Sequence, residues 1–529
     1  MTWLGEVPRM RAERHFDGRV VRCFAERPVG FDAMLRAAAI GHPAGEALVA
    51  GDDRLTYAEF DHLVDRLAAD LTVHGLAAGD RIGVLLENGI PFVIVLAAIV
   101  RIGAIAVLLN IREEQPELAY ILDHSGSVGL FHSAALAAKV PPANAVPDLH
   151  KRFIVADDWL GQLRAVPRGV SPRPHTASEE DVAAILYTSG TTGRPKGAML
   201  THLGLVHAAM IYEACMGLTH ADRSIVSVPM SHVTGLTAAI AAMLRVAGTL
   251  IIVPAFKADA FIALAAAERM THTVMVPAMY NLCLLQPEFA RADLSAWRVG
   301  GYGGAPMPEV TIARLAERLP GLKLMNAYGS TETTGPVVLM PPHLGVTRRE
   351  AVGRAVPPAE ILIMDEAGRE VAAGESGEVW LRAPNVVKGY WRNPEATADS
   401  FVAGFWRSGD LGRVDGEGFV TLLDRIKDMI NRGGFKVYSV EVENVLAAHP
   451  DIIEAAVIGR PCPVLGERVH AFVVSRDPGL EVHQLRTHCA GQLADYKTPE
   501  TFTVLSAPLP RNANGKVLKR DLRATLPAG

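Results

Sequence analysis

Apolar residues recur at helical spacing directly after Thr56. Thr56 and Glu59 have the separation of a capping box, in which each side chain bonds the backbone N–H of the other residue. The segment closes at Gly75, and glycine commonly follows a helix C-terminus. We therefore expect a helix between these limits, with an apolar face formed by Phe60, Leu63, Val64, Leu67 and Leu71.

Short, continuous apolar runs alternate with helical segments through the first part of the chain. RIGVLL (81–86) and AIAVLL (104–109) flank a segment that Pro91 can open and Gly103 can close. Arg101 and Gly103 interrupt this apolar stretch, which therefore indicates a buried helix and strand rather than a membrane span. Buried strands joined through helices predict a parallel sheet covered on both faces. We also expect strands at 181–188, 224–230, 248–254 and 272–277 and a helix at 259–270.

The pattern changes after about residue 350, where short alternating strands are separated by Gly, Asp and Glu turns. The Asp-Gly pair at 415–416 predicts a hairpin. A small α+β segment follows from Lys427. The expected fold class is α/β, with a large N-terminal α/β body containing parallel sheets, a small β-rich subdomain and a small α+β C-terminal domain. We place the domains at residues 1–424 and 425–529.

Composition and charge exclude several classes of protein. The chain has 529 residues, 49% of them apolar, which is enough for more than one core. The formal net charge is -5 and there is no long basic stripe, which argues against a nucleic-acid-binding protein. The 5 cysteines are scattered without metal-binding spacing, and the first residues hold no apolar signal core. We expect reduced thiols and a cytoplasmic location.

The segment YTSGTTGRPKGAML (187–200) concentrates glycine and hydroxyl residues around one lysine. Backbone N–H groups in such a turn form a concavity for anions, and Lys196 supplies a positive charge for phosphate. The spacing does not fit the Walker A motif. A flexible surface turn is the alternative that this stretch alone leaves open.

Four further clusters, each taken alone, also allow both a ligand-binding role and an ordinary structural one. NAYGSTETTG (326–335) places Glu332 among hydroxyls that suit Mg²⁺, and GGYGGAP (300–306) is rich in glycine without fitting a dinucleotide fingerprint. SGDLG (408–412) offers Asp410 to a pair of ribose hydroxyls. PRNANGKVLKR (510–520) presents Lys516 just after an Asn-Gly turn. A solvated charge or an ordinary turn residue is the alternative in each case.

Together, and in this order, the five clusters resemble the adenylate-forming superfamily, which comprises acyl- and aryl-CoA synthetases (AMP-dependent synthetases and ligases), peptide-synthetase adenylation domains and beetle luciferases. The resemblance extends from the Thr56 region to Arg520. It implies an acyl-CoA synthetase that joins a carboxylate to the α-phosphate of ATP and releases pyrophosphate. The acyl group then passes to the thiol of coenzyme A, and AMP leaves. Mg²⁺ would be the metal cofactor, ATP a substrate and coenzyme A the co-substrate.

The resemblance also assigns roles to positions. Glu332 would be the Mg²⁺ ligand, Tyr328 would stack on adenine, and Asp410 with Arg425 would hold the ribose. Lys516 would contact both the carboxylate and the α-phosphate, and it shares the catalytic role with Thr188, Lys196 and Glu332. The implied ATP and AMP site comprises Thr188, Ser189, Gly190, Thr191, Thr192, Gly193, Lys196, Gly303, Gly304, Ala305, Asn326, Tyr328, Gly329, Thr331, Asp410, Arg425 and Lys516.

In this family the C-terminal domain is mobile and rotates between the two steps about a residue that aligns with Lys427. The rotation removes Lys516 and brings in the coenzyme A loop, which aligns with Gly433 and Gly434. VLGERV stands where some relatives carry a tryptophan for the coenzyme A adenine. The implied acyl pocket comprises His232, Val233, Leu236, Tyr302, Gly303, Gly335, Pro336 and Val337, with His232 favoured as a satisfied pocket histidine over a general base.

The pocket residues indicate the class of acid. Peptide-synthetase domains usually carry an aspartate in the segment that matches PMSHVTG, and none stands there in this chain. A medium- or long-chain fatty acid or an aromatic acid is therefore expected. The alternatives are a stand-alone enzyme that loads an acyl carrier protein, and an inactive nucleotide-binding relative. We expect no nucleic-acid partner and no membrane span, and the sequence leaves open whether the chain forms a homodimer.

Overall fold

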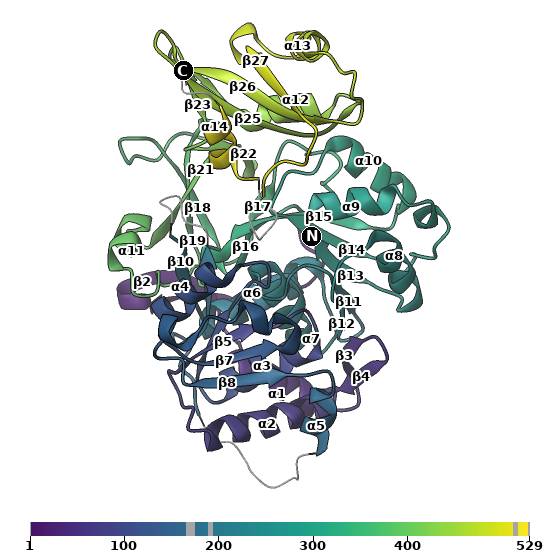
Figure 1. The fold of residues 1–529 in the computed structure, drawn as a ribbon, viewed down its shortest axis with the longest axis vertical. Helices are drawn as coiled ribbons and strands as arrows, with labels where there is room; N and C mark the ends of the chain where they lie inside the picture. Colours follow the sequence, from purple (N-terminus) through teal and green to yellow (C-terminus); the bar gives the residue numbers. More distant parts are fainter. Residues whose placement is uncertain (1, 166–174, 189–193, 512–516, 527–529) are drawn as a thin grey trace. The chain divides into compact units, whose positions relative to one another are not determined.

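The computed structural model describes residues 2–165, 175–188, 194–511 and 517–526. The chain forms two compact units (Figure 1). Unit 1 comprises Met1–Ile361 with Leu381–Trp406, and unit 2 comprises Leu362–Trp380 with Arg407–Gly529. The chain crosses between the units within three strands, β18 (Glu360–Met364), β19 (Gly377–Arg382) and β21 (Phe405–Val414). The domain boundary expected at residues 424 and 425 stays a prediction.

The first sheet of unit 1 has six strands in the order β10-β9-β6-β5-β7-β8. All neighbours are parallel except β10, which runs antiparallel to β9. β5 and β6 are the two apolar runs expected to form strands, and α3 between them is almost entirely buried. The strands are β10 (Lys196–Thr201), β9 (Val182–Thr188), β6 (Ile105–Leu108), β5 (Arg81–Leu85), β7 (Ser127–Ser133) and β8 (Lys151–Val155), and the helix is α3 (Ile90–Arg101).

The helix expected after Thr56 is α2 (Tyr57–Val73), and both hydrogen bonds of the Thr56–Glu59 capping box are present. α2 packs on α3 and on α1 (Phe31–Gly41), which lie together beside the first sheet (Figure 1). Among the described residues, no helix combines the length and apolar character that crossing a membrane requires. The stretch at 91–110 is thus a buried helix and strand, as expected.

The second sheet of unit 1 runs in the order β17-β16-β15-β14-β13-β11-β12-β3-β4. Its central strands are parallel, from β15 through β12 to β3, and β16 turns back antiparallel to β15. The strands are β17 (Gly353–Ala355), β16 (Gly335–Leu339), β15 (Lys323–Ser330), β14 (Val299–Gly303), β13 (His272–Met275), β11 (Arg223–Val226), β12 (Thr249–Ile252), β3 (Glu46–Ala50) and β4 (Asp53–Thr56).

Strands β11 and β13 are shorter than the sequence pattern predicted. β11 ends at Val226 and β13 at Met275, before Pro229 and Pro277. Proline cannot donate to a strand ladder, and Pro277 instead occupies the start of α9 (Pro277–Leu284), where its fixed φ suits a helix. The helix expected at 259–270 is α8 (Ala258–Ala267), and α10 (Glu309–Arg318) completes this side of unit 1 (Figure 1).

Helix α6 (His202–Met216) links the two sheets. It is buried on almost every side, and it contacts β10 of the first sheet and β16 of the second. A helix that is apolar all round belongs in a core. Because β10 follows the glycine-rich segment and β16 follows Glu332, α6 fixes these two parts of the expected site against one hydrophobic core.

Unit 2 combines an antiparallel hairpin with an α+β fold. β21 pairs with β22 (Phe419–Arg425) around the Asp-Gly turn at 415–416, so the expected hairpin is confirmed. A five-stranded sheet follows and carries helices and its own apolar core. Its elements are β23 (Ile430–Arg432), β24 (Phe435–Val437), α12 (Ser439–Ala447), β25 (Ile452–Cys462), β26 (Gly466–Ser475), α13 (Val482–Ala490), β27 (Thr501–Leu505) and α14 (Lys519–Thr525).

Candidate active site

Thr188 and Lys196 close the two ends of the glycine-rich segment. They are direct partners in the antiparallel β9–β10 ladder, and Thr188 Oγ1 donates to the Lys196 carbonyl at 3.5 Å. Ser189, Gly190, Thr191, Thr192 and Gly193 lie outside the described residues. The ladder places the last residue of β9 and the first residue of β10 side by side, where the glycine-rich segment leaves one strand and enters the next.

Glu332 lies in a short 3₁₀ turn, η6 (Thr331–Thr333), between β15 and β16. The residue is 9% exposed, and three hydroxyl groups surround its carboxylate. Oε1 accepts from Tyr390 at 3.0 Å and from Thr188 Oγ1 at 3.4 Å, and Oε2 accepts from Ser330 Oγ at 3.0 Å. An oxygen-only donor set around one carboxylate fits Mg²⁺, which takes one or two carboxylates together with substrate phosphates.

Tyr390 is a site residue that the sequence analysis missed. Its ring lies 5.0 Å from Lys196 Nζ, and its hydroxyl bonds Glu332. Burial, and next the Glu332 charge, raise the pKa of Tyr390 well above its usual value, so the hydroxyl stays protonated and donates. The backbone explains the placement, because Tyr390 pairs with Ala198 and Trp391 N–H donates to the Gly197 carbonyl. The segment GYWRNPEAT (389–397), which contains Tyr390, is the sequence signal that could have indicated it.

Gly303, Gly304 and Ala305, which belong to the implied ATP site and are expected to form a strip along the adenine, lie where β14 ends beside β15. Gly303 pairs with Ala327, and a Cβ on Gly303 would stand 2.4 Å from the Ala327 carbonyl oxygen. Gly304 has a φ of 79°, a left-handed value that favours glycine. Asn326, Tyr328 and Gly329 follow on β15, where the pairing with β16 is irregular. Ala305 and Thr331 lie directly after β14 and β15. Crevices at the carboxyl ends of parallel strands are common ligand sites in α/β folds.

Leu236 lies within a seven-residue π-helical segment, η4 (Gly235–Ala241), His232 and Val233 directly precede it, and Gly335 lies close to its Thr237. A Cβ on Gly335 would meet Ala208 Cβ of α6 at 3.1 Å and Thr237 Oγ1 of η4 at 3.5 Å, so small size is needed there. The apolar candidates Val233, Leu236, Tyr302 and Val337 are all buried. π-Helical turns occur often at functional sites.

His232 precedes this segment, and burial lowers its pKa to about 4. The imidazole is therefore neutral at neutral pH, and its Nδ1 accepts from Thr234 N–H at 3.3 Å. A neutral ring with this backbone contact suits a pocket wall better than a base. The assignment of His232, Pro336 and the other candidates to an acyl pocket stays a prediction.

In unit 2, Asp410 and Arg425 are direct partners across β21 and β22. Arg425 Nε lies 3.3 Å from Asp410 Oδ1, and the Asp410 side chain is 14% exposed against 42% for Arg425. The Asp410 N–H donates to Ser408 Oγ, and this bond holds the backbone just before the Asp410 side chain in place. An oriented carboxylate of this kind can accept from two adjacent hydroxyls, which suits the expected ribose contact.

The coenzyme A and hinge candidates also belong to unit 2. Gly433 and Gly434 form the turn between β23 and β24 with φ values of 60° and 91°, so both glycines occupy left-handed backbone. Gly433 N–H donates to the Leu465 carbonyl at 2.7 Å. Lys427 is exposed just after β22. Lys516 lies outside the described residues, and its role stays a prediction.

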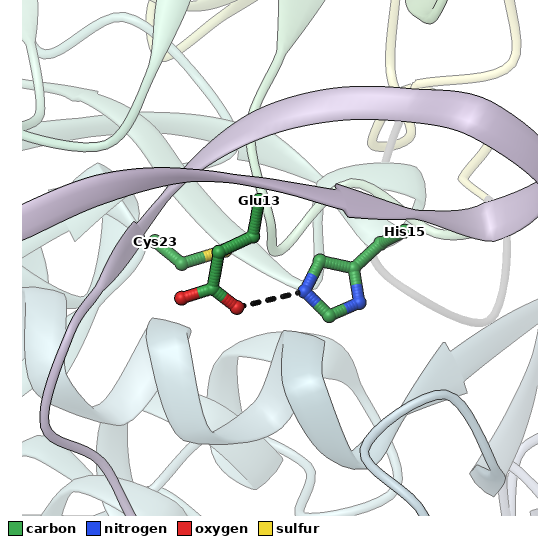
Figure 2. A group of neighbouring side chains, drawn as sticks. All are labelled: Glu13, His15 and Cys23. Carbon is green, nitrogen blue, oxygen red and sulfur yellow. Dashed lines mark hydrogen bonds and ion pairs between the residues drawn. The ribbon is translucent and has the colours of Figure 1, made fainter.

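A second group of metal-ligating residue types lies on the N-terminal hairpin of β1 (Met10–His15) and β2 (Arg19–Phe24). Glu13 and His15 point toward each other beside Cys23 (Figure 2), with His15 Nε2 at 3.2 Å from Glu13 Oε2. Arg27 already pairs with Glu13 at 2.7 Å, and burial raises the pKa of the Cys23 thiol to about 12. A thiol must lose its proton to bind a metal. Glu13 is therefore already engaged by Arg27, and Cys23 stays a protonated thiol beside this ion pair.

Comparisons with known proteins agree with this geometry. Residues 35–391 match the AMP-binding enzyme family, and residues 441–516 match the AMP-binding enzyme C-terminal domain. Long-chain-fatty-acid–CoA ligase FadD13 of Mycobacterium tuberculosis is 35% identical over 507 residues, which cover 93% of this chain and 99% of FadD13. Feruloyl-CoA synthase of an Amycolatopsis species is 36% identical over 492 residues, covering 91% and 96% of the two chains.

Solved structures of adenylate-forming enzymes also match this chain. The o-succinylbenzoate CoA synthetase (MenE) of Bacillus subtilis, in complex with its acyl-adenylate intermediate, superimposes with a TM-score of 0.85 at 28% identity and covers 95% of this chain and 99% of its own. The α/β fold, the enzyme class and the use of ATP, Mg²⁺ and coenzyme A follow from these matches together. The chain belongs to the adenylate-forming superfamily and is an ATP-dependent, AMP-forming acyl-CoA synthetase.

Proposed function

We propose that this acyl-CoA synthetase activates a medium- or long-chain fatty acid or an aromatic acid. The observation that carries the proposal is the character of the pocket candidates: Val233, Leu236, Pro336 and Val337 are apolar and buried, Tyr302 is buried, and His232 is neutral. A neutral imidazole cannot pair with a second carboxylate or an ammonium on the substrate, since both would remain uncompensated in an apolar pocket. The substrates named for FadD13 and feruloyl-CoA synthase, a long-chain fatty acid and ferulate, belong to these two classes.

In the first step a carboxylate oxygen of the acid attacks the α-phosphorus of ATP, and the bond to the bridging oxygen of pyrophosphate breaks. Thr188 and Lys196 bind the leaving phosphates, and Lys516 contacts the attacking carboxylate and the α-phosphate. Thr331 lies beside Glu332 and contacts the α-phosphate. Glu332 would hold Mg²⁺, which would supply positive charge for the phosphate oxygens when bound. The remaining rate enhancement comes from holding the two reactants in line.

In the second step the coenzyme A thiolate attacks the acyl carbon, and AMP leaves as the C–O bond breaks. We assign Gly433 and Gly434 to the approach of the pantetheine chain, because their left-handed turn carries no side chain. The C-terminal domain, residues 425–529, rotates about Lys427 between the steps and takes Lys516 out of the thiol path. The N-terminal domain, residues 1–424, holds the ATP and acyl sites.

We propose that the enzyme is cytoplasmic, and its assembly is left to measurement. The enzyme needs ATP and free coenzyme A, and its five cysteines are unpaired in the structure, which supports a cytoplasmic location. Whether two copies form a homodimer is measurable by light scattering at the concentration used for the assay.

Product identification tests the proposal. The protein is incubated with ATP, Mg²⁺ and a panel of acids (short to long fatty acids, benzoic, cinnamic and ferulic acid, and a dicarboxylate), with and without coenzyme A. Mass spectrometry should show an acyl-CoA that forms only with coenzyme A and only from the fatty or aromatic members. Turnover confined to the dicarboxylate or to acetate would overturn the assigned acid class. An acyl-adenylate that persists with coenzyme A present would point instead to carrier-protein loading.

A further inference from the structure

We propose that Tyr390 is a positioning residue for Mg·ATP, holding the Glu332 carboxylate with its hydroxyl and the Lys196 ammonium with its ring. The inference deepens the proposed function and rests on the phosphate and metal roles given there to Lys196 and Glu332. It adds a residue that none of the five sequence clusters contains.

Two contacts from one side chain carry the argument. The Tyr390 hydroxyl donates to Glu332 Oε1 at 3.0 Å, and the Tyr390 ring centroid lies 5.0 Å from Lys196 Nζ. A cation at this distance from an aromatic face is attracted by the ring quadrupole. A single side chain therefore contacts both charged groups that are expected to meet the β- and γ-phosphates.

The surroundings allow Tyr390 little freedom. The residue is 6% exposed, and its backbone N–H donates to Thr397 Oγ1 at 2.9 Å. Its ring packs edge-on against Phe401 at 5.8 Å, and its backbone bridges to Ala198 of β10. β10 begins at Lys196, so the same strand that bears the lysine also anchors the tyrosine. Locked positioning residues of this kind preserve the geometry of a site before the ligand arrives.

The arrangement keeps the opposite charges of Lys196 and Glu332 from pairing with each other. Among the described residues Lys196 and Glu332 form no ion pair with each other, although both contact Tyr390. A direct pair would occupy the carboxylate oxygen that a metal needs and the ammonium that a phosphate needs. Tyr390 instead gives each group a neutral partner that leaves its charge available. The carboxylate keeps further lone pairs, and the ammonium keeps its N–H donors for phosphate.

Two substitutions distinguish the contribution of the Tyr390 hydroxyl from that of its ring. Tyr390→Phe removes the bond to Glu332 and keeps the ring beneath Lys196, whereas Tyr390→Leu removes both. Tyr57→Phe is the matched control, because the buried Tyr57 hydroxyl is bonded to the Met243 and Gly248 carbonyls and, among the residues that the structure describes, to no side chain of the site. Calorimetry measures binding of ATP with excess Mg²⁺, without acid or coenzyme A, and separately binding of AMP in EDTA.

Tyr390→Phe should weaken Mg·ATP binding about tenfold, the usual scale for a hydrogen bond to a charged group, and leave metal-free AMP binding unchanged. Tyr390→Leu should lose a further several-fold for Mg·ATP, and Tyr57→Phe should lower only the melting temperature. Unchanged Mg·ATP binding by folded Tyr390→Phe would overturn the inference. An equal loss of Mg·ATP and metal-free AMP binding would also overturn it, since that indicates general damage. Because no acid is present, an error in the proposed acid class does not alter these outcomes.

Discussion

Lys519 Nζ lies 2.6 Å from the Glu443 carboxylate, and both side chains are largely buried in unit 2. The same ammonium donates to Ser439 Oγ at 2.7 Å, and Ser439 in turn donates to the buried Asp424 carboxylate. Burial raises the pKa of both Glu443 and Asp424, and Lys519 acts against that rise in each case. One cation therefore stabilises two buried carboxylates, three residues after Lys516.

Replacing Lys519 with methionine should destabilise unit 2 by about 3–5 kcal/mol, because two buried carboxylates would lose their compensating charge. Urea unfolding at pH 7.5 measures the change. Lys436→Met is the matched control, since Lys436 and its partner Glu366 are both exposed, and it should cost under about 0.5 kcal/mol. Equal unfolding midpoints for Lys519→Met and the wild type would show that Lys519 does not carry this role.

Local patterns predicted the local elements well. The Thr56–Glu59 box, the β5 and β6 runs and the Asp-Gly hairpin all depend on residues close in sequence, and all are present. β11 and β13 end at Val226 and Met275, shortly before Pro229 and Pro277, and the expected strands ran further because a pattern of apolar residues does not register that proline lacks an N–H.

Contacts between distant segments could not be predicted in the same way. Tyr390 and Glu332 are far apart in the chain, and their contact depends on how segment 389–391 pairs with β10. The π-helical segment at Gly235–Ala241 is apolar all round and gives no period that distinguishes it from an ordinary helix. Residues 362–380 belong to unit 2 and residues 381–406 to unit 1, and the change of pattern after about residue 350 does not show this division, which depends on tertiary contacts.

If Lys516 acts in the first step as proposed, its removal should slow the two half-reactions to different extents. Lys516→Ala should reduce acyl-adenylate formation by at least about a hundredfold, because the attacking carboxylate and the α-phosphate lose their shared cation. Thioester formation from supplied acyl-adenylate should stay near the wild-type rate. Pyrophosphate release and acyl-CoA formation are measured separately, and equal losses in both steps would contradict the assignment.

A comparison of two glycines tests the adenine strip. Gly303→Ala places a Cβ 2.4 Å from the Ala327 carbonyl, so β14 must shift away from β15 and the strip must move. We expect ATP binding to weaken about tenfold or more, on the scale of a core overpacking strain of about 1–3 kcal/mol. Gly321→Ala is the control, since a Cβ there meets nothing within 4 Å. Calorimetry with ATP gives both affinities, and similar values would remove the steric argument.

Cys462 differs from the other four cysteines in the direction of its pKa shift, and it is 7% exposed, against 1% or less for the others. The N–H groups of Leu465 and Val464 and the Arg468 guanidinium, at 3.1 Å from the sulfur, lower the pKa of the Cys462 thiol. Burial raises the pKa of Cys23 and Cys283 to about 12 and of Cys489 to about 11, and raises that of Cys215 as well. Because the thiolate is the nucleophile, iodoacetamide at pH 7.5 should label Cys462 first. Peptide mapping checks the order, and Arg468→Met should slow the labelling.

His207 makes the folded protein sensitive to acid. Its Nε2 accepts from Phe24 N–H at 3.1 Å and its Nδ1–H donates to the Leu203 carbonyl at 2.9 Å, so both ring nitrogens are satisfied only in the neutral form. Burial lowers its pKa to about 3, and burial lowers that of the equally enclosed His272 to about 4. Between these values and about 6.5 the unfolded chain binds more protons than the folded chain.

Stability should therefore be complete above about pH 6.5 and should fall as the pH drops toward 4, with His207 contributing about 2–3 kcal/mol of the loss at pH 4.5. Urea unfolding at pH 7.5 and pH 4.5 measures the difference. His207→Gln offers an amide to the same two backbone partners without titrating, so it should lower stability at pH 7.5 and shrink the difference between the two pH values. The exposed His483→Gln should leave the wild-type difference intact. A difference that His207→Gln does not reduce would place the acid sensitivity elsewhere in the protein.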